Sequence, residues 1–249
     1  MQKDKEYILY KQNPIIRGHF LTNETNGNKL TLISEFDLDV LNAIYLITQQ
    51  DLFAAHPIHY KELVRLEIPI NSIQKLLLRK RRNIEEIRTS INNLFSTDIV
   101  LKDFTHPISG SKYREYHTHI INKYGYKKEN KNICEIEFDE LFLVNILRHP
   151  KKDSKIGNFT PIRLHSSASL RSKYAKRLYE YAMSINGKET FSMSMNSLNK
   201  LFGTNHKYFG RIVEILKRIE EQMKQVVQFE YEVFKKDKLI SFKISERKI

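Results

Sequence analysis

The order of predicted elements in the second half of the chain is the strongest constraint on its fold. Apolar residues at helical spacing predict a helix over residues 169–185, and a short strand follows at 189–193. Two further helices are predicted at 196–202, where Gly203 ends the helix, and at 208–225. Strands at 227–234 and 239–244, joined by a basic turn, form a hairpin. Helix, strand, helix, helix and hairpin is the order of a winged helix-turn-helix unit.

The first half predicts the same order, less sharply. Its helices are expected at residues 34–50, at 60–66 and from Asn83 onward, with an extended piece at 56–59 and strands at 98–104, 113–124 and 133–138. Val40 and Leu63 are 23 residues apart, as are Ala175 and Leu198. Beyond these pairs the spacing differs, which suggests extra sequence before the third helix of the first half. We therefore expect an α+β protein with two tandem winged helix-turn-helix domains.

A polar, basic stretch at residues 149–158 is typical of a connection between domains. It divides the chain into residues 1–150 and residues 151–249. The role of residues 1–33, a pairing strand or an arm, is left open.

Positive charge is concentrated in the second of these domains. The whole chain has 42 Lys and Arg against 29 Asp and Glu, a net charge of +13. Residues 1–150 hold 21 against 19, a net of +2, and residues 151–249 hold 21 against 10, a net of +11. Concentrated positive charge attracts polyanions, because neutralising phosphates releases condensed counterions. Double-stranded DNA is therefore the expected partner, and solubility alone is the alternative interpretation.

Several function classes are disfavoured by the same composition. Cys134 is the single cysteine, which excludes an intramolecular disulfide and indicates a reducing compartment. There is no run of eighteen apolar residues and no apolar signal region near Met1, so we expect a cytoplasmic protein with no membrane partner. We expect no cofactor and no metal.

The helix-turn-helix order assigns roles to the cations of the second domain. The third helix enters the major groove, and the other helices and the wing contact phosphates. Arg211 is the candidate for a bidentate guanine contact, and the start of that helix adds Lys207 and Tyr208. The expected phosphate contacts are Lys217 and Arg218 farther along the helix, Lys235, Lys236 and Lys238 in the wing, and Lys173, Lys176 and Arg177 on the polar face of the first helix. A solvated helix face and a merely soluble turn are the alternatives.

The first domain contains four consecutive cations, Arg79, Lys80, Arg81 and Arg82, directly before a predicted helix N-terminus. Such a terminus favours anions. Lys75 and Arg88 extend the cationic patch, which predicts phosphate binding, and a nuclear localisation signal is a weaker alternative.

Two rival functions remain open. His117 and His119 lie on one face of a predicted strand, and rolling-circle nicking initiators hold a divalent metal with a similar pair. Three observations disfavour this function: Thr118 lies where that motif has a bulky apolar residue, and no carboxylate cluster accompanies the two histidines. Tyr174, a candidate nucleophile, lies on the inward face of its helix and is better interpreted as a core residue. A plain winged-helix transcriptional regulator is the second rival.

Particular segments resemble a known family. The segment LRSKYAKRLYEYAMSI, then MNSLNKLFG, KYFGRIVEILKRI and FKKDKLISFKI, resembles the second winged-helix domain of iteron-binding, theta-type plasmid replication initiators. The most specific part spans Ser172–Ala175 and Arg177–Glu180, and HYKELVRL with INNLFSTDIVLKDF resembles the first domain of the family.

The resemblance covers roughly residues 34–245 and departs at Arg79–Arg82. It implies binding to direct repeats at a plasmid origin, with both domains on one repeat. It also implies a homodimer that represses its own promoter. We therefore expect the first domain, residues 1–150, to serve dimerisation and contact the DNA backbone, and the second, residues 151–249, to be the principal DNA-binding domain. Origin opening and loading of the host replicative helicase, together with the host initiator ATPase, would follow. No catalytic activity is implied, and the sequence contains no P-loop motif.

Overall fold

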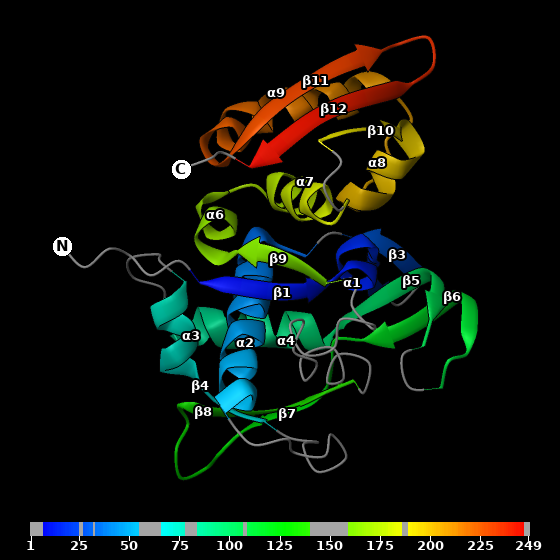
Figure 1. Ribbon diagram of the computed structural model, residues 1–249. Helices are drawn as coiled ribbons and strands as arrows, with labels where there is room; N and C mark the ends of the chain where they lie inside the picture. The colour runs from blue at the N-terminus through cyan, green and yellow to red at the C-terminus, as the bar shows by residue number, and fades with distance from the viewer. Residues whose placement is uncertain are drawn as a thin grey trace, which may run out of the picture.

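The computed structural model describes residues 7–24, 27–31, 33–54, 66–77, 84–106, 109–139, 159–185 and 189–246. Figure 1 shows two parts stacked on one another, with the N-terminal half below and the C-terminal unit above. Strands β1 (Ile8–Gln12) and β9 (Phe159–Arg163) lie side by side between them and pair in antiparallel register.

The C-terminal unit has the predicted winged-helix order. Its elements are α7 (Lys173–Met183), β10 (Thr190–Ser194), α8 (Met195–Phe202), α9 (Phe209–Val226), β11 (Val227–Phe234) and β12 (Leu239–Glu246). The strands form a sheet in the order β10-β12-β11. Helix α8 begins where the Ser194 hydroxyl accepts a hydrogen bond from the Ser197 amide, at 3.2 Å. It ends at Gly203, whose φ of 57° is the left-handed conformation that glycine adopts without a Cβ clash.

The N-terminal half contains a second unit of the same topology. Its elements are α2 (Glu35–Ala54), β4 (Leu66–Pro69), α3 (Ile70–Leu76), α4 (Ile84–Phe95), β7 (Ile121–Tyr126) and β8 (Ile133–Phe138). The strand order β4-β8-β7 matches that of the C-terminal sheet, with the first strand pairing with the last. The prediction of two tandem winged helices is confirmed.

The internal alignment of the two units differs from the predicted one. Met193 follows Ile68 by 125 residues, and the same offset relates seven buried pairs, namely Ile68 and Met193, Ile70 and Met195, Ile73 and Leu198, Leu77 and Phe202, Ile87 and Ile212, Ile91 and Leu216, and Leu94 and Ile219. The second helix therefore starts 14 residues before the third in both units. The extra sequence that precedes the third helix of the first unit lies between α2 and β4, and not between the second and third helices as predicted.

This shift corrects two predicted elements. The predicted strand at 56–59 and most of the predicted helix at 60–66 lie outside the described residues, and Leu66 begins strand β4 instead of ending a helix. The count of 23 residues from Val40 made Leu63 equivalent to Leu198, because both are apolar. In the structure, Ile73 is the residue that occupies the position of Leu198 in the core. The four cations Arg79–Arg82 lie between α3 and α4 in the sequence, within residues 78–83, which are outside the described residues.

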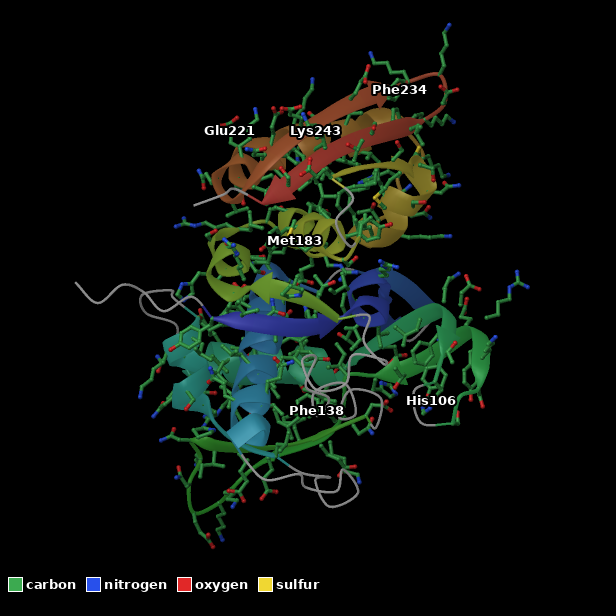
Figure 2. All side chains as sticks on the ribbon, viewed as in Figure 1. His106, Phe138, Met183, Glu221, Phe234 and Lys243 are labelled. Atoms are coloured by element: carbon green, nitrogen blue, oxygen red, sulfur yellow. The ribbon has the colours of Figure 1, made fainter. Side chains whose placement is uncertain are left out.

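A second sheet extends the N-terminal half. It joins β2 (His19–Glu24), β3 (Gly27–Thr31), β5 (Thr97–Thr105) and β6 (Lys112–His119) in the order β3-β2-β5-β6. The single strand predicted at 113–124 is two strands in different sheets, β6 and β7, which separate at the fully buried Ile120. Figure 2 shows His106 at one side of this half and Phe138 within its lower part.

The segment beyond the predicted domain boundary packs against both parts. Pro150 itself lies outside the described residues, so the boundary stays a prediction. Helix α1 (Asn13–Arg17) contacts α7, and helix α6 (Leu164–Ser169) contacts both α2 and α7. The role of residues 1–33 was left open by the sequence, and residues 8–12 form a strand that pairs within the chain. Met183, at the end of α7, lies between the two parts in Figure 2.

Candidate nucleic-acid interface

The start of α9 presents its polar residues to solvent. Lys207 is exposed, Tyr208 is 78% exposed, and the side chain of Arg211 is 63% exposed. Ile212, Ile215, Leu216, Ile219 and Met223 are buried on the opposite face. The helix is therefore fixed by its apolar face, and the residues predicted to contact DNA are on the free one.

Asn199 in α8 holds the turn that leads into α9. Its amide nitrogen donates to the His206 carbonyl at 3.0 Å, and its side-chain oxygen accepts from the Thr204 hydroxyl at 2.8 Å and from the His206 amide at 3.0 Å. Sequence reasoning missed this residue. A signal was present, since a polar residue at a buried helix position needs partners nearby.

Among the residues that the structure describes, the Arg211 side chain pairs with a single carboxylate. Its guanidinium donates to Glu214 at 2.9 Å, in an exposed i,i+3 ion pair. Exposed pairs of this kind contribute little to stability, so a ligand can take over the guanidinium at small cost. Lys217 and Arg218 are also exposed on this face.

The wing lies beside the same helix face. Lys235, Lys236 and Lys238 are exposed in the turn between β11 and β12, and the backbone of Lys238 has a φ of 49°. The Met195 amide donates to the Lys238 carbonyl at 3.0 Å, which ties the wing to the start of α8. Figure 2 labels Phe234 at the wing end of β11.

A hollow of about 440 Å³ separates the wing from the start of α9. Its lining residues come from the first turns of the helix and from the wing, namely Phe209, Gly210, Val213, Glu214, Lys217 and Lys235. The unit therefore presents cations on two elements that flank one depression.

For two of the predicted DNA-contact residues, the predicted position of the side chain was wrong. Lys176 and Arg177 of α7 are fully buried, and neither shares an exposed polar face as predicted. The Lys176 ammonium donates to Asp39 and to the Ser167 carbonyl, both at 2.6 Å. The Arg177 guanidinium donates to the Gly18 carbonyl at 2.8 Å and lies 4.8 Å from the centre of the Phe20 ring.

The physical reason is that α7 is covered on both sides. One side packs on α8 and α9, and the other faces α1, α2 and β9 of the N-terminal half. Periodicity distinguishes an apolar face from a polar one, but it cannot reveal that ionic partners cover the polar face.

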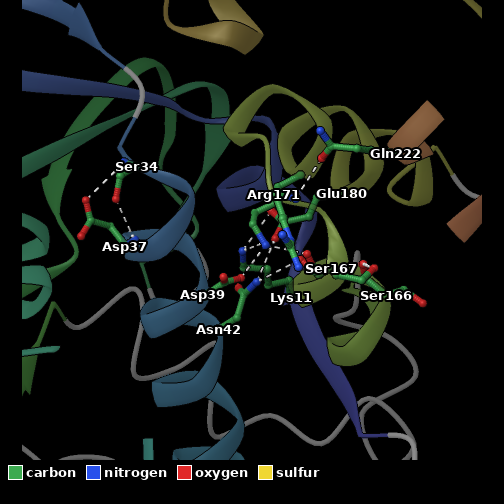
Figure 3. Close-up of polar contacts among 12 residues, drawn as sticks. Lys11, Ser34, Asp37, Asp39, Asn42, Ser166, Ser167, Arg171, Glu180 and Gln222 are labelled. Atoms are coloured by element: carbon green, nitrogen blue, oxygen red, sulfur yellow. Dashed lines mark hydrogen bonds and ion pairs between the residues drawn. The ribbon is translucent and has the colours of Figure 1, made fainter. Parts of the chain in front are cut away.

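Glu180 is the centre of this polar cluster between the two parts (Figure 3). It accepts from the Lys11 ammonium at 2.9 Å and from the Asn42 amide at 3.2 Å. Burial alone would raise the pKa of Glu180, but the charges of Lys11 and Arg177 outweigh it, and the pKa lies below its ordinary value. Burial lowers the pKa of Lys11, and it lowers that of Arg177 to about 10.

The other predicted residues are placed less uniformly. Lys173 is half-buried, with its ammonium 5.5 Å from the centre of the Tyr174 ring. Lys75 is exposed at the end of α3. Arg88 pairs with Glu85, donates to the Lys131 carbonyl at 2.7 Å and lies 5.0 Å from the centre of the Tyr126 ring, so it braces the β7–β8 hairpin. Arg79, Lys80, Arg81 and Arg82 lie outside the described residues.

The two histidines of the rival hypothesis are paired with carboxylates. His117 contacts Glu115 and His119 contacts Asp98, each at 2.7 Å on the exposed face of the second sheet. In the described ranges no cluster of three or more His, Cys, Asp or Glu side chains is arranged to hold a metal ion. Tyr174 packs edge-on against Phe202 at 5.3 Å, as its inward position predicted. Within the part of the chain that the structure describes, no helix is both long and apolar enough to span a membrane.

These observations define the class of the protein, a chain of two winged-helix units with a cationic face on the second. A sequence model of one family, described as the WH1 domain of initiator replication proteins, matches residues 23–183. The match covers more than half of the 249 residues, so the chain belongs to this replication initiator family. The matched span ends at the last residue of α7.

Solved structures have the same fold. The Pi initiator protein in complex with iteron DNA is 14% identical, with a TM-score of 0.64 over 99% of this chain and 100% of that one. Domains 2 and 3 of RctB are 12% identical, with a TM-score of 0.52 over 98% of this chain and 93% of that one. No curated protein sequence matches the chain.

Proposed function

We propose that this protein is a sequence-specific, DNA-binding plasmid replication initiator that binds direct repeats at its origin. The observation that carries the proposal is the exposed cationic face formed by the start of α9 and the wing. Family membership supports it, and so does the fold shared with an initiator whose structure was determined with iteron DNA.

The C-terminal unit is the principal reader in this proposal. The start of α9 enters the major groove, where Arg211 leaves Glu214 to donate two hydrogen bonds to a guanine. Lys207 and Tyr208 lie at the groove entrance. Lys217, Arg218 and the wing lysines 235, 236 and 238 contact phosphates, which fix the register but carry no sequence information.

The N-terminal half takes the remaining roles that the resemblance implies. We assign to it the homodimer and, through Lys75 and the cations at 79–82, contacts with the DNA backbone. As a dimer the protein represses its own promoter, and at the origin it helps to open the duplex and load the host replicative helicase with the host initiator ATPase. The protein acts in the cytoplasm by binding, without catalysis of its own.

The test is binding of the full-length protein to a duplex carrying one direct repeat from upstream of its own gene. A scrambled duplex is the control, and both are titrated over a series of salt concentrations. We expect selective binding and a steep fall of affinity with salt, because several phosphates are neutralised. Equal, weak binding to both duplexes would contradict the proposal and leave only non-specific attraction.

A nicking assay on supercoiled origin plasmid with magnesium or manganese addresses the rival function. We expect the plasmid to stay closed. A product covalently linked to a tyrosine would replace this proposal with a nicking initiator.

A further inference from the structure

The hollow between α9 and the wing has an apolar floor within a cationic surface. Phe209 and Val213 are partly buried and pack against the core, while Glu214, Lys217 and Lys235 lie around them. In a surface built to attract phosphates, an apolar floor needs a separate explanation.

Gly210 lies on the same floor and has no internal reason to be a glycine. It is an exposed position in the first turn of α9, and its φ is not positive. A Cβ added there would meet nothing within 4 Å. Glycine weakens a helix relative to alanine, so neither the backbone nor the packing of this chain explains it. Close approach of a ligand to the helix backbone explains a glycine at this position.

The chemistry of the floor selects the ligand group. Among the groups that base pairs expose in the major groove, the 5-methyl of thymine is apolar and the others are hydrogen-bond donors or acceptors. A donor or acceptor placed over Phe209, Gly210 and Val213 would lose its hydrogen bonds to water. The Glu214 carboxylate in turn disfavours a phosphate in the hollow.

We infer that this hollow reads the methyl group of a thymine, with Gly210 as the position that lets the base approach and Val213 and Phe209 as its contacts. The inference rests on the proposed function, because it needs α9 in a major groove. It adds a specificity-determining surface to the one expected at Arg211.

The experiment replaces each thymine of the direct repeat, one at a time, with deoxyuridine, which removes only the methyl group. We expect that substitution at one thymine, or at two adjacent ones, makes the duplex bind the full-length protein about fourfold more weakly, because one buried methyl group is lost. The variants Gly210→Ala and Val213→Ala are then measured on the thymine and uracil duplexes. Gly210→Ala should bind the thymine duplex more weakly and lose the preference for thymine over uracil, while its melting temperature stays equal or rises.

Gly125→Ala is the matched control, since it adds the same methyl group at another open glycine, in β7 of the first unit. It should keep the full preference for thymine. Selective binding with no sensitive thymine overturns this inference and leaves the proposed function intact. So does a sensitive thymine whose effect is unchanged in both Gly210→Ala and Val213→Ala. If the unaltered protein binds the direct repeat and the scrambled duplex equally, both this inference and the proposed function are overturned.

Discussion

The two winged-helix units share one core and differ in the surface of their third helix. At the same five exposed positions, α4 has Glu85, Glu86, Thr89, Asn92 and Asn93, and α9 has Gly210, Arg211, Glu214, Lys217 and Arg218. The first set is acidic or neutral, whereas the second contains three cations. Buried positions thus preserve the fold in both units, and the exposed positions give the two third helices different charge.

The polar residues of α4 are also used inside the molecule. Asn92 accepts a hydrogen bond from the Tyr124 hydroxyl at 2.9 Å, and Asn93 donates to Asp37 at 3.4 Å. At the start of α9, Arg211 and Glu214 pair with each other. Farther along the helix, Glu220 accepts from the Tyr231 hydroxyl at 3.4 Å and Gln222 accepts from the Arg171 amide at 2.9 Å. The third helix of the first unit therefore supports its neighbours at these positions, whereas the first half of α9 presents them to solvent.

The largest expected effect is on the free energy of unfolding, and it concerns the buried polar cluster around Glu180 that joins the two units. Replacing Glu180 with Ala leaves Lys11 and Arg177 buried without their carboxylate, which should destabilise the protein by about 3–5 kcal/mol. Chemical denaturation of the full chain measures the change. Glu221→Ala, at an exposed position of α9, is the control and should leave the midpoint unchanged. An equal midpoint for both variants would mean that the units are not joined through this cluster.

The same cluster predicts a dependence on pH. The pKa of Glu180 is lower in the folded protein than in the unfolded chain, so its contribution is complete above the ordinary carboxylate pKa of about 4.3. That contribution is lost as the pH falls through the folded value. The difference in unfolding free energy between the unaltered protein and Glu180→Gln should therefore shrink below about pH 4, and a constant difference would contradict this assignment.

Arg211→Ala and Glu86→Ala test the difference between the two helices at equivalent positions. Loss of the guanine contact should cost about 1–3 kcal/mol on the direct repeat and relax one base preference. Glu86→Ala should leave selectivity unchanged, because it removes an acid from a helix assigned no base contact. Binding to the repeat and to a scrambled duplex measures both. Equal losses on the two duplexes for Arg211→Ala would remove its role in reading bases.

Sequence patterns predicted the C-terminal unit well because its connections are short and its signals local. Gly203 and the apolar stripe of α9 each mark an element within a few residues. The first unit was harder, since the stretch between α2 and β4 shifted the count of apolar positions. Lys176 and Arg177 were misplaced for another reason. Their partners Asp39 and Gly18 are more than 130 residues away in the sequence, and no local pattern encodes such contacts.

Asn199 tests whether the turn before α9 needs its own support. Asn199→Ala removes three hydrogen bonds and leaves the partly buried His206 amide without its acceptor, which should cost about 1–3 kcal/mol of stability. Asn196→Ala, at an exposed position of the same helix, should cost much less. Thermal unfolding measures both. If the two variants unfold alike, the turn is held by its backbone alone.

The smallest effect separates local phosphate contact from overall charge. Lys235→Ala should weaken binding to the repeat and to the scrambled duplex about equally, and should reduce the slope of log affinity against log salt by about one. Lys243→Ala removes the same charge from β12, where Lys243 faces Glu230 at 3.6 Å (Figure 2). Its slope should change less, because the slope counts phosphates neutralised at the contact and not net charge. Equal slopes for the two variants would place the wing outside the backbone contacts and leave α9 as the source of the salt dependence.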